Sequence, residues 1–204
     1  MVKSRLLVAS AIGAVTIAIP AAVYAHFILQ APASWVVENQ LGDPQKAGPC
    51  GGSTTQTLTN AVTSVRGGDP IHIKVQETIY HPGFFRVALS VLDRKELPAD
   101  PEETVRKNAR GADISVSGKI ESAPQPPVLA DGLFLHHTNV RNQVFEADVK
   151  LPNINCAKCS LQVIQFMEEH GVNAEGRFTY HHCADLKITA NPDMPIDKRW
   201  PGQG

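Results

Sequence analysis

The sequence predicts an all-β fold, an antiparallel β-sandwich with long loops. Short apolar segments with strand-like alternation recur along the chain, and runs rich in glycine and proline separate them. Neither an internal repeat nor a convincing long amphipathic helix interrupts this pattern. Because strands with one apolar face must bury it against a second layer, two packed sheets are the expected architecture.

The first 25 residues have the pattern of a cleaved secretory leader. A basic start with Lys3 and Arg5 precedes an apolar run over residues 6–19, and Val23 and Ala25 occupy the small-residue positions before a cleavage site. The apolar run is short for a membrane-spanning helix, which needs about 20 apolar residues. We therefore expect a secreted or periplasmic protein. The alternatives are an uncleaved anchor and a cut one or two residues away.

Removing these 25 residues from the 204 leaves residues 26–204, a length of 179 that suits one domain. The leader takes 2 of the 19 basic residues and none of the 20 acidic ones, so the mature chain has 17 against 20, a net charge of −3. This charge excludes a strongly basic nucleic-acid-binding domain. We expect a monomer with no nucleic-acid partner and no membrane contact after cleavage.

The strands of the first half follow from alternation and from the residues that end them. We predict strands over residues 26–31, 58–65, 71–79 and 84–92. Pro32 ends the first because proline cannot donate to a sheet ladder, and residues 34–52 form a loop rich in glycine and proline. Trp35, at the start of this loop, is expected to be a buried anchor rather than a ligand-stacking surface. His72 is expected to face outward.

The second half is also read as strands joined by loops. Residues 101–107 are charged and long enough for a short helix opening at proline, exposed to solvent, and residues 123–128 form a stiff proline-rich loop. Further strands are predicted at residues 143–151, 160–167 and 178–188, with an irregular tail over 192–204. His136 and His137 are neighbours in an extended segment, so at most one of them can point toward any given site.

Four cysteines lie beyond the leader, and an even number in an oxidising compartment predicts two disulfides. The sequence alone permits three pairings. Cys156 and Cys159 form a CxxC motif, but no second CxxC completes a zinc site and no βαβ pattern supports a thioredoxin-like unit. A local disulfide is therefore favoured for this pair.

Cleavage after Ala25 would make His26 the first residue, with a free α-amine and an imidazole on one Cα. Together with one further imidazole, this gives three nitrogen donors in a T, an arrangement that suits the tetragonal preference of copper and not tetrahedral zinc. Deprotonating the amine at pH 7 costs on the order of 1.4 kcal/mol, far less than metal affinities of roughly 10–16 kcal/mol. His81 stands in a His-Pro-Gly turn at a predicted sheet edge, which suits a ligand held at the rim.

These residues carry a resemblance to the lytic polysaccharide monooxygenases or a close copper-binding relative. It spans most of the mature chain and rests on the leader ending before His26, on Pro49-Cys50-Gly51-Gly52, on His81-Pro82-Gly83, on the run from Cys156 to Phe166, and on Tyr180-His181-His182-Cys183-Ala184-Asp185-Leu186. The resemblance implies an immunoglobulin- or fibronectin-III-like sandwich that holds one copper ion on a flat face.

The resemblance also implies the roles of individual residues. His26 would bind copper through its amine and Nδ1, His81 through Nε2, and Tyr180 would shield the axial side. Gln165 and His170 are, by position only, candidates for a hydrogen-bonding side chain near the reacting oxygen. The resemblance further suggests that Cys50 pairs with Cys183, which leaves Cys156 with Cys159.

The activity that the resemblance implies is oxidative cleavage of a β-linked glucan or chitin by hydroxylation at C1 or C4. It needs an external electron donor and a polysaccharide surface as partners. A non-catalytic copper-binding or copper-acquisition protein is the alternative, and a sandwich adhesion domain without metal is a third hypothesis.

Three features depart from the family pattern. His181 and His182 follow Tyr180 directly, and His182 would share its face of the strand. Asp185 invites comparison with relatives that use an aspartate as an additional copper ligand, but it lies five residues past Tyr180, on the opposite face of a regular strand. Aromatic residues make up only 6% of the chain, so a stacking surface for crystalline polysaccharide is not evident.

Overall fold

The computed structural model describes residues 26–52, 55–171 and 178–203, and its strands confirm the all-β prediction. The described residues contain no α-helix, and the 3₁₀ turn η1 (Arg94–Glu96) is their only helical element. The predicted leader, residues 1–25, lies outside the described residues. No helix in the described part of the chain is long and apolar enough to cross a membrane.

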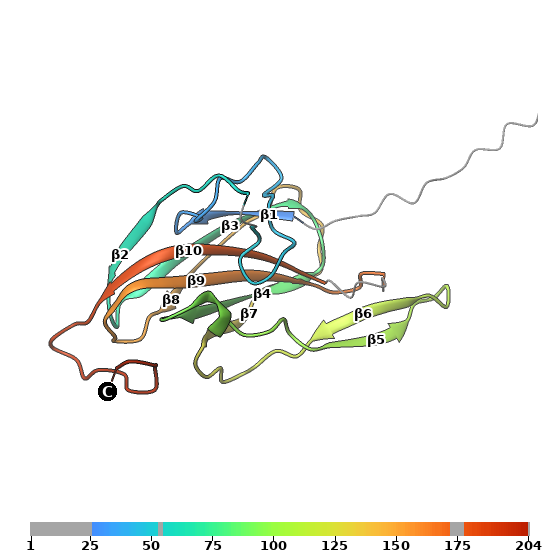
Figure 1. Ribbon diagram of the computed structural model, residues 1–204. Coiled ribbons are helices and arrows are strands. Elements are labelled where there is room, and N and C mark those ends of the chain that lie inside the picture. The colour runs from blue at the N-terminus through green and yellow to red at the C-terminus, as the bar shows by residue number, and fades with distance from the viewer. Residues whose placement is uncertain (1–25, 53–54, 172–177, 204) are drawn as a thin grey trace, which may run out of the picture.

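Two sheets form the sandwich (Figure 1). The three-stranded sheet has the order β1-β3-β8 and contains β1 (His26–Ala31), β3 (Pro70–Ile79) and β8 (Val144–Lys150). The five-stranded sheet has the order β2-β10-β9-β4-β7 and contains β2 (Val62–Arg66), β10 (Thr179–Thr189), β9 (Cys156–Met167), β4 (Gly83–Ser90) and β7 (Val128–His136). All neighbouring strands are antiparallel except β2, which runs parallel to β10.

The main core lies between the two sheets. Strands of the three-stranded sheet contribute Phe27, Ile73 and Val75, and those of the other sheet contribute side chains such as Phe85 and Leu161, all fully buried. Burial of one large apolar side chain contributes about 1.5–3 kcal/mol. The alternation that predicted the strands therefore reflects one face of each strand turned to this core.

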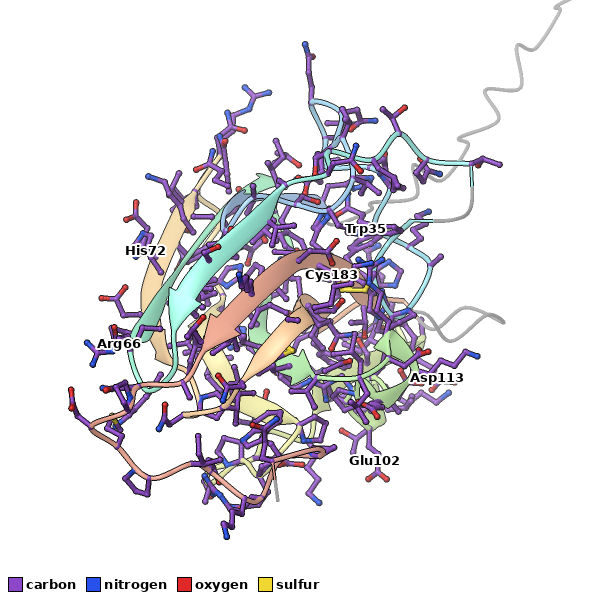
Figure 2. All side chains as sticks on the ribbon, turned by 60° about the vertical axis from the view of Figure 1, so that its left-hand side comes forward. Trp35, Arg66, His72, Glu102, Asp113 and Cys183 are labelled. Atoms are coloured by element: carbon purple, nitrogen blue, oxygen red, sulfur yellow. A yellow bond between two sulfur atoms is a disulfide. The ribbon has the colours of Figure 1, made fainter. Side chains whose placement is uncertain are left out.

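The loop over residues 34–52 covers the outer face of the five-stranded sheet. A disulfide ties its Cys50 to Cys183 of β10, and Trp35 Nε1 donates a hydrogen bond of 2.9 Å to the Cys50 carbonyl. Trp35 is half-buried, and Figure 2 shows it beside Cys183. The guanidinium of Arg94 lies 3.9 Å from its ring centroid. Trp35 is thus the anchor that the sequence predicted, and the Cys50–Cys183 pairing is present.

The second pairing, Cys156 with Cys159, lies within β9 and is also present, so both expected disulfides are found. The tail after β10 contains turns but no strand up to residue 203, in agreement with the predicted irregular tail. Trp200 of this tail is nevertheless buried against the main core.

One prediction of local structure is wrong. Residues 101–107 do not form a helix, because β5 (Glu103–Lys107) pairs with β6 (Asp113–Gly118) as a separate two-stranded sheet. Glu102 and Asp113 mark this arm in Figure 2. Every side chain of β5 is exposed, so the predicted solvent exposure is correct although the backbone is extended. Cross-strand pairing, which is not visible in a short charged segment, decided the conformation here.

Candidate metal centre

The strand register brings the three predicted site residues to one end of the sandwich (Figure 1). His26 opens β1 opposite Ile79, the last residue of β3, and His81 follows two residues later. Tyr180, the second residue of β10, packs its ring against that of His26, with centroids 5.2 Å apart. We call His26, His81 and Tyr180 the histidine site.

His26 lies near one acidic side chain of the covering loop. Its ring is largely buried, and Nε2 lies 3.7 Å from Oδ2 of Asp43. This separation is longer than a hydrogen bond, so the contact is electrostatic. A chelate with the α-amine would use Nδ1, the ring nitrogen nearer the main chain. Thr78 Oγ1 donates to the His26 carbonyl over 3.0 Å and holds the strand end in place.

The surroundings of His81 favour Nε2 instead. Nδ1 lies 3.2 Å from the carbonyl oxygen of Pro82, which can only accept, so Nδ1 carries the proton. Nε2 is left with the lone pair that a metal ligand needs. Burial of the ring lowers the pKa of His81, an effect that the neighbouring His170 reinforces and the hydrogen bond to Pro82 opposes. The neutral, ligand-competent form is therefore favoured at neutral pH.

His170 lies directly beside His81. The two rings are stacked, with centroids 5.2 Å apart and an angle of 30° between their planes. The arm formed by β5 and β6 fixes this segment, because Ser115 N donates to the His170 carbonyl over 2.9 Å and His170 N donates to Ser115 Oγ over 3.1 Å. His170 therefore packs against a predicted ligand, and its role there stays a prediction.

Gln165 is fully buried. In the five-stranded sheet it lies between two paired residues, Tyr180 of β10 and Phe85 of β4. Its amide donates a hydrogen bond of 2.6 Å to Oε1 of Glu77, across the interface between the two sheets. The same Oε1 accepts from the main-chain N–H of His81 over 3.1 Å. Gln165 is thus connected to His81 through one carboxylate oxygen.

Glu77 and His136 lie next to the histidine site, although neither is among the residues predicted for it. Glu77 is 1% exposed, and Nε2 of His136 lies 3.2 Å from its Oε1. The inward positions of β3 are Ile71, Ile73, Val75 and then Glu77. An acidic residue at a position where the alternation calls for an apolar one is informative in the sequence. Because burying an unpaired charge is costly, such a residue is expected to have a specific partner or role. His137 points the other way, and its side chain is 57% exposed.

The remaining candidate side chains belong to other clusters. His72 is half-exposed between Asp148 and Glu146, and in Figure 2 it lies well away from Trp35 and Cys183. Asp185 pairs with Arg94 at 2.6 Å, so its carboxylate is engaged on the outer face of β10. This agrees with the predicted orientation of Asp185 away from Tyr180.

His181 and His182 are both buried, on opposite faces of β10. His181 Nε2 lies 2.7 Å from Oδ1 of Asp100 on the outer side. His182 Nε2 donates to the carbonyl of Phe27 over 2.9 Å, and its Nδ1 lies 3.1 Å from Oε1 of Glu38. Through its hydrogen bond to Phe27, His182 connects β10 to β1, the strand that begins with His26.

The histidine site has a donor set that suits copper only when the α-amine of His26 is free. Among the described residues, no group of three or more histidine, cysteine, aspartate or glutamate side chains could hold a metal ion. Two imidazoles and a terminal amine would still supply three nitrogen donors, the kind of ligand that copper accepts. The amine depends on cleavage after Ala25, which lies outside the described residues.

The comparisons with known proteins add no identification. No protein-family model matches the sequence, and no curated protein matches it either. The family resemblance therefore rests on the motifs of the chain itself.

Proposed function

We propose that this protein is a secreted mononuclear copper protein of the lytic polysaccharide monooxygenase type, which oxidises β-linked glycans such as chitin or cellulose. The observation that carries the proposal is the placement of His26, His81 and Tyr180 at one end of the sandwich, with a hydrogen bond from Nδ1 of His81 to Pro82 that leaves Nε2 of His81 as the favoured ligand. The two disulfides agree with an oxidising compartment.

The residues of the site have distinct roles in this proposal. The amine and Nδ1 of His26 and Nε2 of His81 would hold one copper ion, which supplies one-electron redox chemistry toward dioxygen or peroxide when an external donor reduces it. The ring of Tyr180, 2% exposed and packed on His26, would exclude water from that side of the ligand. The ring of His170, stacked on His81, would offer a polar group to a reactant that binds beside it.

A glycan would approach across the rim of the histidine site. Tyr80 precedes His81 and is half-buried, and the exposed His137 and the partly exposed Asp43 add polar groups. These side chains can form hydrogen bonds with sugar hydroxyls.

Product analysis tests the catalytic proposal. Copper-loaded mature protein, a reductant and peroxide are incubated with chitin or cellulose, and soluble products are examined by mass spectrometry. Oligosaccharides oxidised at C1 or C4 are expected with the wild type and not with His81→Ala. Copper binding without oxidised product from a panel of β-linked glycans would contradict the catalytic part of the proposal.

A non-catalytic copper-binding role is the second candidate, and one observation favours it. Every aromatic side chain in the described residues is buried or half-buried, so none offers a fully exposed face on which a sugar ring could stack. For this role we expect tight copper binding by the same two histidines and transfer of the metal to a competing chelator or partner. Absence of copper binding altogether would favour the adhesion hypothesis.

A further inference from the structure

Glu77 connects three separate segments beneath the histidine site. Its carboxylate is 1% exposed, and Oε1 accepts from the main-chain N–H of His81 at 3.1 Å, from Gln165 Nε2 at 2.6 Å and from His136 Nε2 at 3.2 Å. These donors come from the turn between β3 and β4, from β9 and from β7. One oxygen atom thus ties the turn that carries His81 to both sheets of the sandwich.

His136 is held on both sides of its ring. Nδ1 lies 2.7 Å from the carbonyl oxygen of Phe134, and Nε2 lies 3.2 Å from Oε1 of Glu77. The side chain of His136 is 8% exposed, so both contacts lie inside the protein. The ring therefore connects β7 to the carboxylate of Glu77.

Stability alone does not explain a carboxylate at this position. The second oxygen of Glu77, Oε2, is buried and has no hydrogen-bond partner among the described residues, and the same is true of Oε1 of Gln165. Replacing buried ion pairs by apolar residues of similar volume is often neutral or stabilising. An unpartnered oxygen on a buried acid, at an otherwise apolar inward position of β3, therefore points to a role in the adjacent site.

We propose that Glu77 is a positioning residue for His81: by fixing the main chain of His81 against Gln165 and His136, it holds the second imidazole in the geometry that copper binding requires. The inference rests on the proposed copper site. Removal of a carboxylate that holds a metal ligand in position typically weakens metal affinity by about 10–100-fold.

The test compares Cu(II) dissociation constants, measured by calorimetry on the mature protein beginning at His26, for the wild type, Glu77→Gln, Glu77→Asp and His81→Ala. Glu146→Gln is the matched control, because Glu146 lies on the exposed face of the same sheet in an ion pair with Lys74 at 2.8 Å. Glu77→Gln keeps an acceptor oxygen but loses the charge, and a neutral amide oxygen accepts more weakly than a carboxylate. It is expected to weaken binding by about 10–100-fold, Glu77→Asp is expected to restore part of it, and Glu146→Gln is expected to leave it unchanged.

A second measurement needs neither copper nor a variant. In the metal-free wild type, the amide proton of His81 is expected to exchange slowly with solvent, because it is hydrogen-bonded to a buried carboxylate. Fast exchange would overturn the inference even if Glu77→Gln did not fold. With a folded Glu77→Gln, faster exchange at His81 should accompany the weaker copper binding.

The outcomes separate the two proposals. If His81→Ala binds copper as tightly as the wild type, the proposed copper site is wrong. If His81→Ala loses affinity but Glu77→Gln matches Glu146→Gln, the copper site stands and the positioning role of Glu77 is overturned.

Discussion

The ring of Tyr180 packs against the ring of His26 at a centroid distance of 5.2 Å, and this contact joins the first residue of β1 to the start of β10. Because the two strands belong to different sheets, the contact fixes the strand end that carries the predicted copper ligand. Tyr180 is 2% exposed, so its ring also fills part of the core at this end.

Shortening Tyr180 should therefore affect both stability and the site. Tyr180→Ala is expected to destabilise the protein by about 3–5 kcal/mol, the range for removing a buried aromatic ring. Tyr180→Phe keeps the ring and should lose only about 1 kcal/mol, the net value of a hydrogen bond. Urea unfolding of the metal-free proteins measures both values. Equal loss in the two variants would show that the hydroxyl, and not ring packing, is the important contact.

The two disulfides should differ in their contribution to stability. Cys50 and Cys183 are 133 residues apart, whereas Cys156 and Cys159 are 3 apart. In the loop-entropy model the longer connection stabilises by about 5 kcal/mol and the shorter by about 2 kcal/mol. The paired serine variants Cys50→Ser with Cys183→Ser should thus unfold at much lower urea concentration than Cys156→Ser with Cys159→Ser. The reverse order would contradict the expectation.

Stability should also depend on pH through Glu38 and His182. Burial raises the pKa of Glu38 to about 7, above its ordinary value of 4.5, and burial lowers the pKa of His182 to about 4, below its ordinary value of 6.5. Between about pH 4.5 and 7 the native protein keeps a proton on Glu38 that the unfolded chain has released, so this residue makes stability fall as pH rises. Between about pH 4 and 6.5 the unfolded chain holds the extra proton on His182, so His182 makes stability rise with pH.

Glu38→Gln separates these opposing effects. An amide resembles the protonated acid and can donate to Nδ1 of His182, which lies 3.1 Å from Glu38 Oε1. We expect the variant to match the wild type near pH 4.5 and to exceed its stability by on the order of 3 kcal/mol above pH 7. Urea unfolding of both proteins over this pH range measures the difference. A difference that stays constant with pH would contradict the protonated state of Glu38.

Asp185 provides a test of which acids belong to the site. Its carboxylate pairs with Arg94 at 2.6 Å on a partly exposed surface, so Asp185→Ala should destabilise the protein by no more than about 1 kcal/mol. Its copper affinity should equal that of the wild type. A clear loss of copper affinity would instead support the type of relative in which an aspartate is an additional ligand.

The fold was predictable where burial produces alternation. The inward phase of β3 and the apolar segments of β4 and β9 mark the strands that enclose the core, and proline and glycine mark where they stop. The arm formed by β5 and β6 was not predictable, because its β5 side chains are all exposed and its pairing leaves no apolar pattern.

Candidate ligands could be proposed from the sequence, but the residues that surround them could not. His26 and His81 were proposed from the predicted leader and from a turn, because a chelate of this kind needs a terminal amine and a second imidazole. The contact between His170 and His81 and the connection from Gln165 to His81 through Glu77 depend on which strands are neighbours. Glu77 itself could have been found from the sequence, because it occupies an inward position of β3 where an apolar residue is expected.

The electron paramagnetic resonance spectrum of copper-loaded protein tests the central claim most directly. The spectrum of protein with a verified His26 N-terminus is compared with those of His81→Ala and of a chain extended by one residue ahead of His26. We predict an axial spectrum with nitrogen couplings that both changes abolish, because one removes an imidazole and the other converts the amine to an amide. The same spectrum in all three proteins would contradict the proposed copper site.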